Sequence, residues 1–219
     1  MKTPSEELLS SFRAIASDPK WNAASDVPDP SFDIPDTEAE RRACATDFAA
    51  LFGGQTPEPM LAAILLPDLI KLRWSRGDIA GEAAISNPVA SLGRPLDELS
   101  CRYTVDGFPL SDFRIFDAVT DSTGPIYVGF RVRSGVAEPA LYLFDNSNVA
   151  PMSIDIPQYL RQLSRSLGIL YWQYLFVDLG IPLPRKKIIQ SGLDALKRWG
   201  VIDLDLLEAR LSHRRSARD

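Results

Sequence analysis

The chain has 219 residues, of which 45% are hydrophobic and 24% are charged, and its formal net charge is −5. This composition is typical of a globular protein and excludes wholesale disorder, and the length suits one domain or one domain with an added arm. No apolar run approaches the ~18 residues that a bilayer crossing needs. The first residues, "MKTPSEELLSSF", lack the apolar region of a secretory signal. We therefore expect no membrane partner, and an acidic chain disfavours nucleic acid as a partner.

Cysteine usage and the spread of charge refine this expectation. Cys44 and Cys101 lie in unrelated contexts without CxxC spacing, which predicts buried free thiols and favours a cytoplasmic location. Residues 1–60 carry 11 acidic and 5 basic side chains, whereas residues 151–219 carry 7 acidic and 11 basic ones. Only the C-terminal part could favour an anionic partner.

Residues 1–59 are expected to form a helical and proline-rich arm packed on the rest of the chain. "SEELLSSFRAIAS" predicts a helix capped by Ser5. Its apolar face comprises Leu8, Leu9, Phe12, Ile15 and Ala16. The next stretch, "DPKWNAASDVPDPSFDIPD", has four prolines and five aspartates in 19 residues, which predicts a linker or a surface loop. "DTEAERRACATDFAALFGG" predicts a second helix that ends at the Gly53-Gly54 pair.

Residues 60–219 are expected to form an α+β domain. "LAAILLPDLIKLRW" is broken at Pro67, so it is either two helical turns or a helix followed by a strand. From residue 78 onward come short segments rich in Val, Ile, Tyr and Phe, separated by turn residues: "DIAGEAAI", "SCRYTVDGF", "FRIFDAV", "IYVGFRVR", "ALYLFD" and "VAPMSID". Consecutive strands without helical spacers predict an antiparallel meander sheet with helices packed around it and helical additions at both ends. We expect one globular unit overall.

After the meander, Asp155 is the expected cap of a helix that ends at Gly168. Two short helices around Gly200 are expected in the final third. An aromatic run directly follows the helix that ends at Gly168: Tyr171, Trp172, Tyr174 and Phe176. Trp172 and Phe176 are four apart and can share one buried helical face, which would contribute about 3–6 kcal/mol, with the tyrosine hydroxyls toward the rim. The pattern favours core over site.

The sequence contains few candidate catalytic residues. His213 is the one histidine, so the sequence excludes a Ser-His-Asp triad and a multi-histidine metal site. Four acids lie near the expected strand ends: Glu82, Asp117, Asp121 and Asp145. Asp is common at such positions because it stabilises turns, although paired acids could also act as general acid and general base. "PRKKIIQ" indicates a solvated helix start. We expect no catalytic residue, no metal site and no cofactor.

The most suggestive surface segment is acidic and lies in the N-terminal arm. Its candidate partner-binding residues are Asp26, Asp29, Phe32, Asp33, Asp36, Glu38 and Glu40. Such a segment is either a solvated loop or a docking surface that steers a basic partner.

"LYLFDNSNVAPMSIDIPQYLRQL" followed by "GILYWQYLF" resembles the SUKH superfamily of yeast Smi/Knr-type regulators and bacterial immunity proteins. The matching positions are Asp145, Ile154, Tyr159, Leu160 and Trp172-Gln173, and upstream Leu66, Pro67 and Gly77 in "LPDLIKLRWSRGDIAGE". The resemblance covers about residues 60–180, and the family's usual Asn-Gly-Gly is absent. It implies an α+β fold and a non-catalytic role.

The first functional hypothesis is therefore an immunity protein that binds a cognate bacterial toxin and occludes its active site, with a basic nuclease as one candidate toxin. Two alternatives stay open. One is a carboxylate-dependent hydrolase, with or without a metal ion, and the other is a regulatory scaffold.

Overall fold

The structure is a computed structural model of the chain. It describes residues 3–26, 46, 66, 69–87, 104–105, 108–121, 124–133, 136–145, 148–201 and 203–214. Within these residues one antiparallel sheet has the strand order β1-β2-β3-β6-β7-β8-β9. Its strands are β1 (Ala24–Asp26), β2 (Leu69–Arg76), β3 (Ile79–Ser86), β6 (Phe113–Asp121), β7 (Gly124–Arg133), β8 (Val136–Asp145) and β9 (Asn148–Pro151). A separate ribbon pairs β4 (Thr104–Val105) with β5 (Phe108–Pro109).

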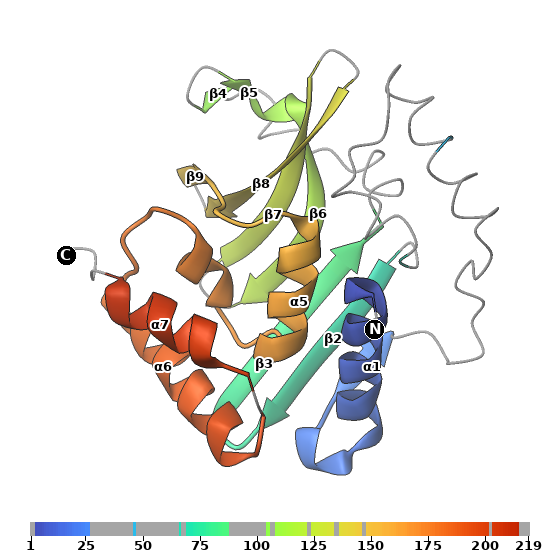
Figure 1. The fold of residues 1–219 in the computed structure, drawn as a ribbon, viewed down its shortest axis with the longest axis vertical. Helices are drawn as coiled ribbons and strands as arrows, with labels where there is room; N and C mark the ends of the chain where they lie inside the picture. The colour runs from blue at the N-terminus through green and yellow to red at the C-terminus, as the bar shows by residue number, and fades with distance from the viewer. Residues whose placement is uncertain are drawn as a thin grey trace.

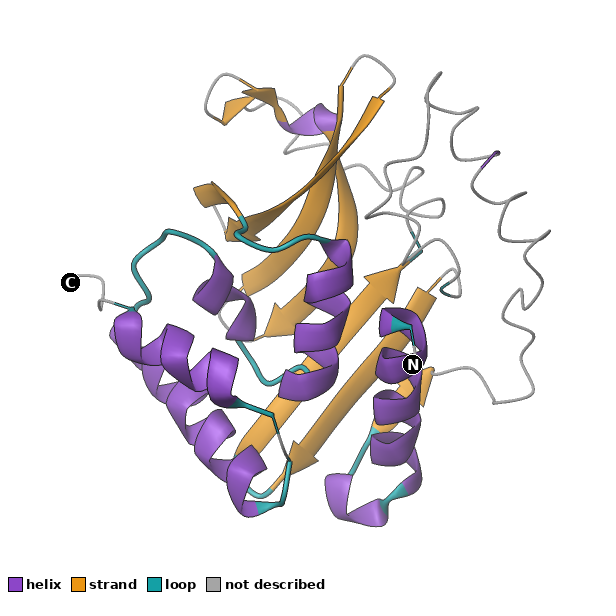
Figure 2. Cartoon of the chain, viewed as in Figure 1, coloured by secondary structure: helices purple, strands orange, loops and turns teal. Residues whose placement is uncertain are grey.

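The helices lie over one face of this sheet (Figure 1; Figure 2). They are α1 (Pro4–Ser17), α5 (Ile156–Ser166), α6 (Leu183–Arg198) and α7 (Asp205–His213), with 3₁₀ turns η1 (Pro19–Trp21), η3 (Leu110–Asp112) and η4 (Trp172–Phe176). The predicted fold class, an α+β meander with helices around it and at both ends, is confirmed. Among the described residues, none of the helices combines the length and apolar character that a membrane crossing requires.

The N-terminal helix belongs to the main core. Leu8, Leu9, Phe12 and Ile15 are buried as expected, whereas Ala16 is exposed. The predicted cap was wrong: Thr3 caps α1, and its hydroxyl accepts the Glu6 amide while the Glu6 carboxylate accepts the Thr3 amide. The predicted boundary near residue 60 lies outside the described residues, as do Cys44 and Cys101. So does the predicted helix over residues 36–54, except for Thr46, which is helical.

The described first half of the proline-rich stretch, residues 18–26, is more regular than expected. It begins with the turn η1 and continues into β1, which pairs with β2 at the edge of the sheet. An edge position tolerates proline nearby because one side of the strand needs no ladder hydrogen bonds.

The meander buries alternate side chains, as its pattern predicts. In β7, Ile126, Val128 and Phe130 are buried in the main core. On β6 and β8, Phe113 and Phe144 join Leu110 of η3 in a second, smaller apolar cluster. β7 therefore has apolar neighbours on more than its core-facing side, and Arg131 is buried as well.

The aromatic run is core, as predicted, but its local structure differs. Residues 172–176 form the 3₁₀ turn η4, and all five side chains are buried. The rings of Trp172 and Phe176 meet edge-on with centroids 5.9 Å apart. The tyrosine hydroxyls do not reach a solvent rim, because Tyr171 and Tyr174 are both buried.

Three tryptophans from distant segments of the chain pack around one arginine. Trp21 of η1, Trp74 of β2 and Trp199 after α6 pack edge-on, with ring centroids 5.0 Å apart for Trp21–Trp74 and 5.3 Å for Trp21–Trp199. The guanidinium carbon of Arg76 lies 4.4 Å from the Trp199 ring centroid and 5.1 Å from that of Trp21. This tryptophan cluster ties both ends of the described chain to the β2–β3 hairpin.

We expect Arg76→Ala to lower the free energy of unfolding by about 1–2 kcal/mol, because the cation lies against two indole rings that shield it partly from water. Arg73→Ala on the same strand is the matched control. Its ion pair with Glu82 is exposed, since the Arg73 side chain is 65% accessible, and it should cost less than about 0.5 kcal/mol. Urea unfolding of both variants measures the difference, and equal losses would contradict the cation–π assignment.

Candidate functional site

The acidic segment expected to bind a partner is almost entirely outside the described residues. Asp29, Phe32, Asp33, Asp36, Glu38 and Glu40 fall there. Asp26 is the last residue of β1, and its backbone stands opposite Lys71 of β2. The docking role of this segment stays a prediction.

Asp117 lies inside a strand, where a turn role does not apply. The pairing of β6 with β7 shifts register between Ile115 and Asp117, and this bulge places the Asp117 side chain in the core, where it is 1% exposed. β3 and β6 share one registered pair, Ile85 with Asp117. Beside that pair, the Asp117 carboxylate accepts the Ala84 amide of β3 at 2.9 Å. The Asp117 side chain thus links β3 to β6, two strands that share a short backbone ladder.

Helix α5 supplies the second donor to Asp117. Tyr159 is fully buried, and its hydroxyl donates to the other carboxyl oxygen of Asp117 at 2.5 Å. The side-chain amide of Gln173, in η4, also lies against this pair. The Asp117–Tyr159 pair is therefore an internal pin between the sheet and α5, and its burial seals it from any substrate.

The surroundings of Asp117 and Tyr159 raise the pKa of both groups. Burial raises the pKa of the Asp117 carboxyl, and hydrogen bonds from Tyr159 and from backbone amides offset part of that rise. Burial first, and the charge of Asp117 second, raise the pKa of the Tyr159 hydroxyl well above its ordinary value. The folded protein therefore holds both protons more tightly than the unfolded chain does.

This proton binding predicts how stability varies with pH. A carboxyl whose folded pKa is raised stabilises the fold fully below its unfolded value, near 3.8, and loses that contribution as the pH rises through the folded pKa. We expect the stability of the wild type, relative to the permanently neutral Asp117→Asn variant, to increase as the pH falls from about 7 to about 4. Urea unfolding of both proteins across this range cancels the other titrations. A flat difference, or one with the opposite slope, would contradict the raised pKa.

Asp145 forms a second internal cluster at the end of β8. The Arg185 guanidinium of α6 donates to the two Asp145 carboxyl oxygens at 2.5 and 3.3 Å, and the Tyr174 hydroxyl donates to one of them. Arg185 also lies over the Tyr171 and Tyr174 rings, 5.0 and 5.2 Å from their centroids. This cluster fixes η4 between the sheet and α6.

The basic run at the start of α6 was expected to be a solvated helix start, which is wrong for two of its three residues. Arg185 is held by Asp145, and the Lys186 ammonium donates to the Arg214 carbonyl at 2.6 Å. Lys187 is exposed.

The remaining acids are dispersed. Glu82 pairs with Arg73 at 2.9 Å, and the side chain of Asp121 lies outside the described part of the structure. His213 is exposed at the end of α7. Among the described residues, no three His, Cys, Asp or Glu side chains gather closely enough to hold a metal ion.

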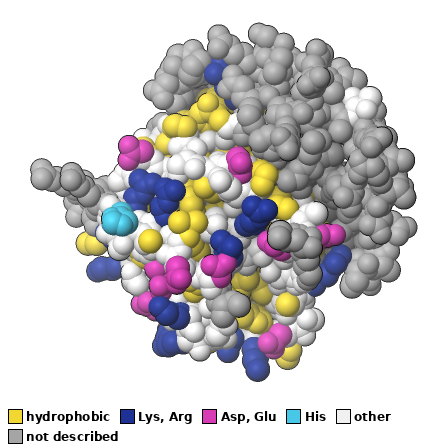
Figure 3. Space-filling model, in the orientation of Figure 1, with side chains coloured by type: hydrophobic (Ala, Val, Ile, Leu, Met, Phe, Trp, Pro, Cys, Tyr) yellow, Lys and Arg dark blue, Asp and Glu magenta, His cyan; other side chains and the backbone are white. Residues whose placement is uncertain are grey.

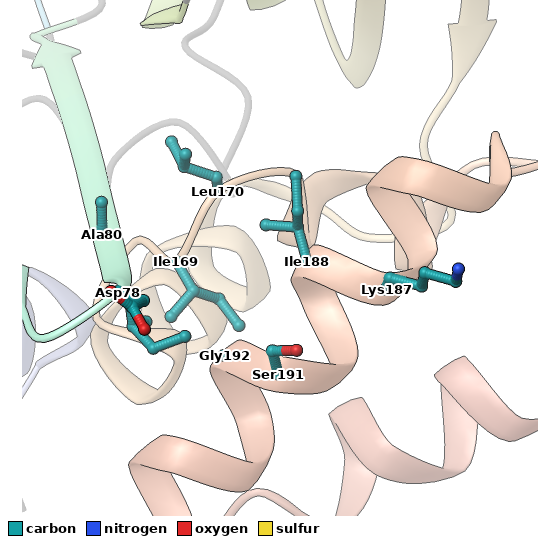
Figure 4. A pocket seen from close by; sticks show the side chains of 9 residues that line it. Asp78, Ala80, Ile169, Leu170, Lys187, Ile188, Ser191 and Gly192 are labelled. Atoms are coloured by element: carbon teal, nitrogen blue, oxygen red, sulfur yellow. The ribbon is translucent and has the colours of Figure 1, made fainter.

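Among the described residues, a half-open pocket of about 430 Å³ is a candidate binding feature of the surface. It lies between the end of the β2–β3 hairpin, the loop after α5 and the middle of α6 (Figure 4). Its lining side chains are mainly apolar, and Ile79, Ala80, Ile169, Leu170 and Ile188 contribute them. Asp78, Lys187 and Ser191 add polar groups. A pocket of this size and lining suits one inserted side chain or a small ligand.

Sequence reasoning missed this pocket, although two signals for it exist. Gly192 lies in the interior of α6, where glycine is unfavourable, and a Cβ there would stand 3.1 Å from the Ile169 side chain. Ile188, in the basic first half of α6, is 41% exposed. A helical glycine and an exposed isoleucine four residues before it mark a close helix contact beside an open apolar rim.

The face that carries the helices mixes charges with exposed apolar side chains (Figure 3). The large apolar side chains exposed among the described residues are Leu183 and Ile188 on α6, at 42% and 41%, and Leu206 on α7, at 40%. Two of the three therefore lie on the helix that borders the pocket. No protein-family profile, no curated protein and no solved structure matches this chain.

Proposed function

We propose that this chain is a non-catalytic protein-binding module, an immunity protein that binds a cognate bacterial toxin in the cytoplasm and occludes the toxin's active site. The observation that carries the proposal is the apolar pocket with the exposed rim residue Ile188 beside it. Exposed apolar side chains next to a concave surface are the usual anchor sites of protein interfaces. Affinity would come from surface complementarity, without a cofactor.

The way the fold uses its acids supports this proposal. The carboxyl oxygens of Asp117 and Asp145 accept hydrogen bonds from groups inside the molecule. These are structural bonds between the sheet, α5 and α6, and they hold the elements that form the pocket walls. A rigid surface loses little entropy when a partner binds, which suits a high-affinity inhibitor.

The order of elements also agrees with the SUKH resemblance. A strand ends at Asp145, the short strand β9 follows, and α5 presents Tyr159 and Leu160 before η4 with Trp172 and Gln173. Fold and function are separable, so the resemblance supports the class of protein and leaves the partner to experiment. The acidic segment from Asp26 to Glu40 remains a proposed second contact for a basic toxin.

The test uses the tagged chain as bait in lysate of its own source, followed by mass spectrometry. We expect one stoichiometric partner. The C-terminal domain of that partner, expressed alone, should arrest growth, and co-expression of this chain should relieve the arrest. Purified chain should inhibit the purified domain at a one-to-one ratio.

Two matched variants connect the activity to the pocket. Ile188→Glu places a charge on the pocket rim and should abolish the relief of growth arrest. Leu206→Glu changes an equally exposed leucine on α7 and should relieve the arrest as the wild type does. A bait that captures no stoichiometric partner, or a partner whose activity the chain leaves unchanged, would overturn the proposed function.

A further inference from the structure

The pocket walls are held in place before any partner binds. The Glu82 amide of β3 donates to the Gly168 carbonyl at 2.8 Å, and the Leu170 amide donates to the Ala80 carbonyl at 3.4 Å. These bonds attach the loop after α5 to the hairpin. On the other side, Gly192 lets α6 approach the Ile169 side chain closely. Hairpin, loop and helix therefore form one rigid frame around the apolar surface.

The charges at the pocket lie at opposite sides. Asp78 stands at the end of the β2–β3 hairpin, and Lys187 stands on α6, with its side chain extending away from Asp78 (Figure 4). Within the described part of the chain, neither makes an ion pair. The basic neighbours of Lys187 are already engaged, because Arg185 is paired with Asp145 and Lys186 bonds to a carbonyl. An occupant thus meets one negative group and one positive group with apolar surface between them.

A row of exposed side chains continues beyond the pocket along α6. Leu183, Lys187 and Ser191 are spaced four residues apart and lie on the same side of the helix. Leu183 is 42% exposed, so the row extends toward the start of α6, past the pocket itself. A small molecule would fill the pocket and leave this row uncovered, whereas a peptide segment covers both.

We infer that the pocket is the docking site for one segment of the partner, a segment that inserts an apolar anchor side chain flanked by a basic residue and an acidic residue. The anchor contacts Ile79, Leu170 and Ile188. The basic residue pairs with Asp78, the acidic residue pairs with Lys187, and the backbone of the segment continues over Leu183. This assignment rests on the proposed function and specifies the chemistry of its partner.

The contact is mapped first, by a photoreactive phenylalanine analogue placed at Ser191 in the pocket or, as control, at Ser212. Both serines are exposed and helical, but Ser212 lies on α7 and does not line the pocket. The partner domain identified by the bait experiment is the probe. We expect a cross-link from position 191 and none from position 212. The cross-linked peptide should contain an apolar residue with Lys or Arg on one side and Asp or Glu on the other.

The charge pattern is tested next with a synthetic peptide of the cross-linked segment, by fluorescence anisotropy. Asp78→Lys and Lys187→Glu should each weaken binding about 3- to 10-fold, because each replaces an exposed attraction by a repulsion. Ile188→Glu should weaken it about 30-fold or more, as loss of an anchor contact does. Reversing the basic residue of the peptide should restore binding to Asp78→Lys. Capture of a protein alone would not support the inference without these responses.

Three outcomes of the cross-linking and peptide experiments would overturn the inference, and two outcomes that also bear on the proposed function follow them. The first is a cross-link to a segment without this pattern. The second is a cross-link from position 191 to another copy of this chain or to a small molecule. The third is binding that ignores all three substitutions. A partner that the chain inhibits but that cross-links only from other positions overturns the inference and leaves the proposed function standing, whereas a chain without a partner overturns both.

Discussion

Asp117→Ala will lower the free energy of unfolding by about 3–5 kcal/mol, because it leaves two buried donors without an acceptor and opens a cavity beside them. The donors are the Tyr159 hydroxyl and the Ala84 amide. Tyr159→Phe removes one of these hydrogen bonds while keeping the ring, and should cost about 1.5–3 kcal/mol. Urea unfolding followed by circular dichroism measures both losses.

Tyr142→Phe is the control for the Tyr159 variant. Tyr142 is a partly buried tyrosine on β8 that packs on Phe113 with ring centroids 5.2 Å apart. Its hydroxyl makes no hydrogen bond within the described residues, so its removal should cost less than about 0.5 kcal/mol. Similar losses for the two tyrosine variants would show that Asp117 does not depend on the Tyr159 hydroxyl, and would refute the pin between sheet and α5.

Gly81→Ala is expected to lower the free energy of unfolding by about 3 kcal/mol or more, at the upper end of overpacking effects. A Cβ at position 81 would stand 2.4 Å from the indole of Trp74, on the neighbouring strand. The indole cannot retreat, because its Nε1 donates to the Leu167 carbonyl at 2.6 Å and its ring packs against Trp21. Thermal and urea unfolding measure the loss.

Gly77→Ala provides the comparison for this steric argument. Gly77 has φ +59° in the turn between β2 and β3, and a Cβ there meets nothing within 4 Å. Its replacement should cost only the left-handed backbone penalty of about 1 kcal/mol. In a Trp74→Leu background, the Gly81→Ala substitution should cost less free energy of unfolding than it does in the wild type, because the new methyl group then has room. If Gly81→Ala were no worse than Gly77→Ala, close packing of Trp74 on β3 would be refuted.

Local signals in the sequence predicted much of the fold. Asp155 caps α5, and its carboxylate accepts the Gln158 amide at 2.8 Å. The helix ends where Leu167 and Gly168 adopt positive φ, as the glycine indicated. Strand alternation located β7 and its core face correctly. In each of these cases the decisive contacts lie within a few residues of each other, so the pattern carries the information.

The sites could not be predicted in the same way, because their partners are distant in sequence. Asp117 and Tyr159 are 42 residues apart, and the bulge in β6 shifts the alternation that would assign Asp117 to a face. Arg185 and Asp145 are 40 residues apart, so Arg185 resembled a solvated charge until its partner was placed. The pocket is formed by three elements that are distant in sequence. Only Gly192 and Ile188 gave a local indication of it.

The tryptophan cluster and the short junction between β3 and β6 have a consequence for the order of folding. Strands β6 to β9 occupy one continuous stretch, residues 113–151, and each pairs with the next along the chain. The β2–β3 hairpin is instead covered by residues distant in sequence. Trp21 comes from the N-terminal segment, and Ile169 and Trp199 come from the C-terminal segment. Contacts between near neighbours form faster, because less loop entropy is lost. In refolding monitored by pulsed hydrogen exchange, the meander amides should be protected first, and the hairpin amides only after both distant segments have arrived.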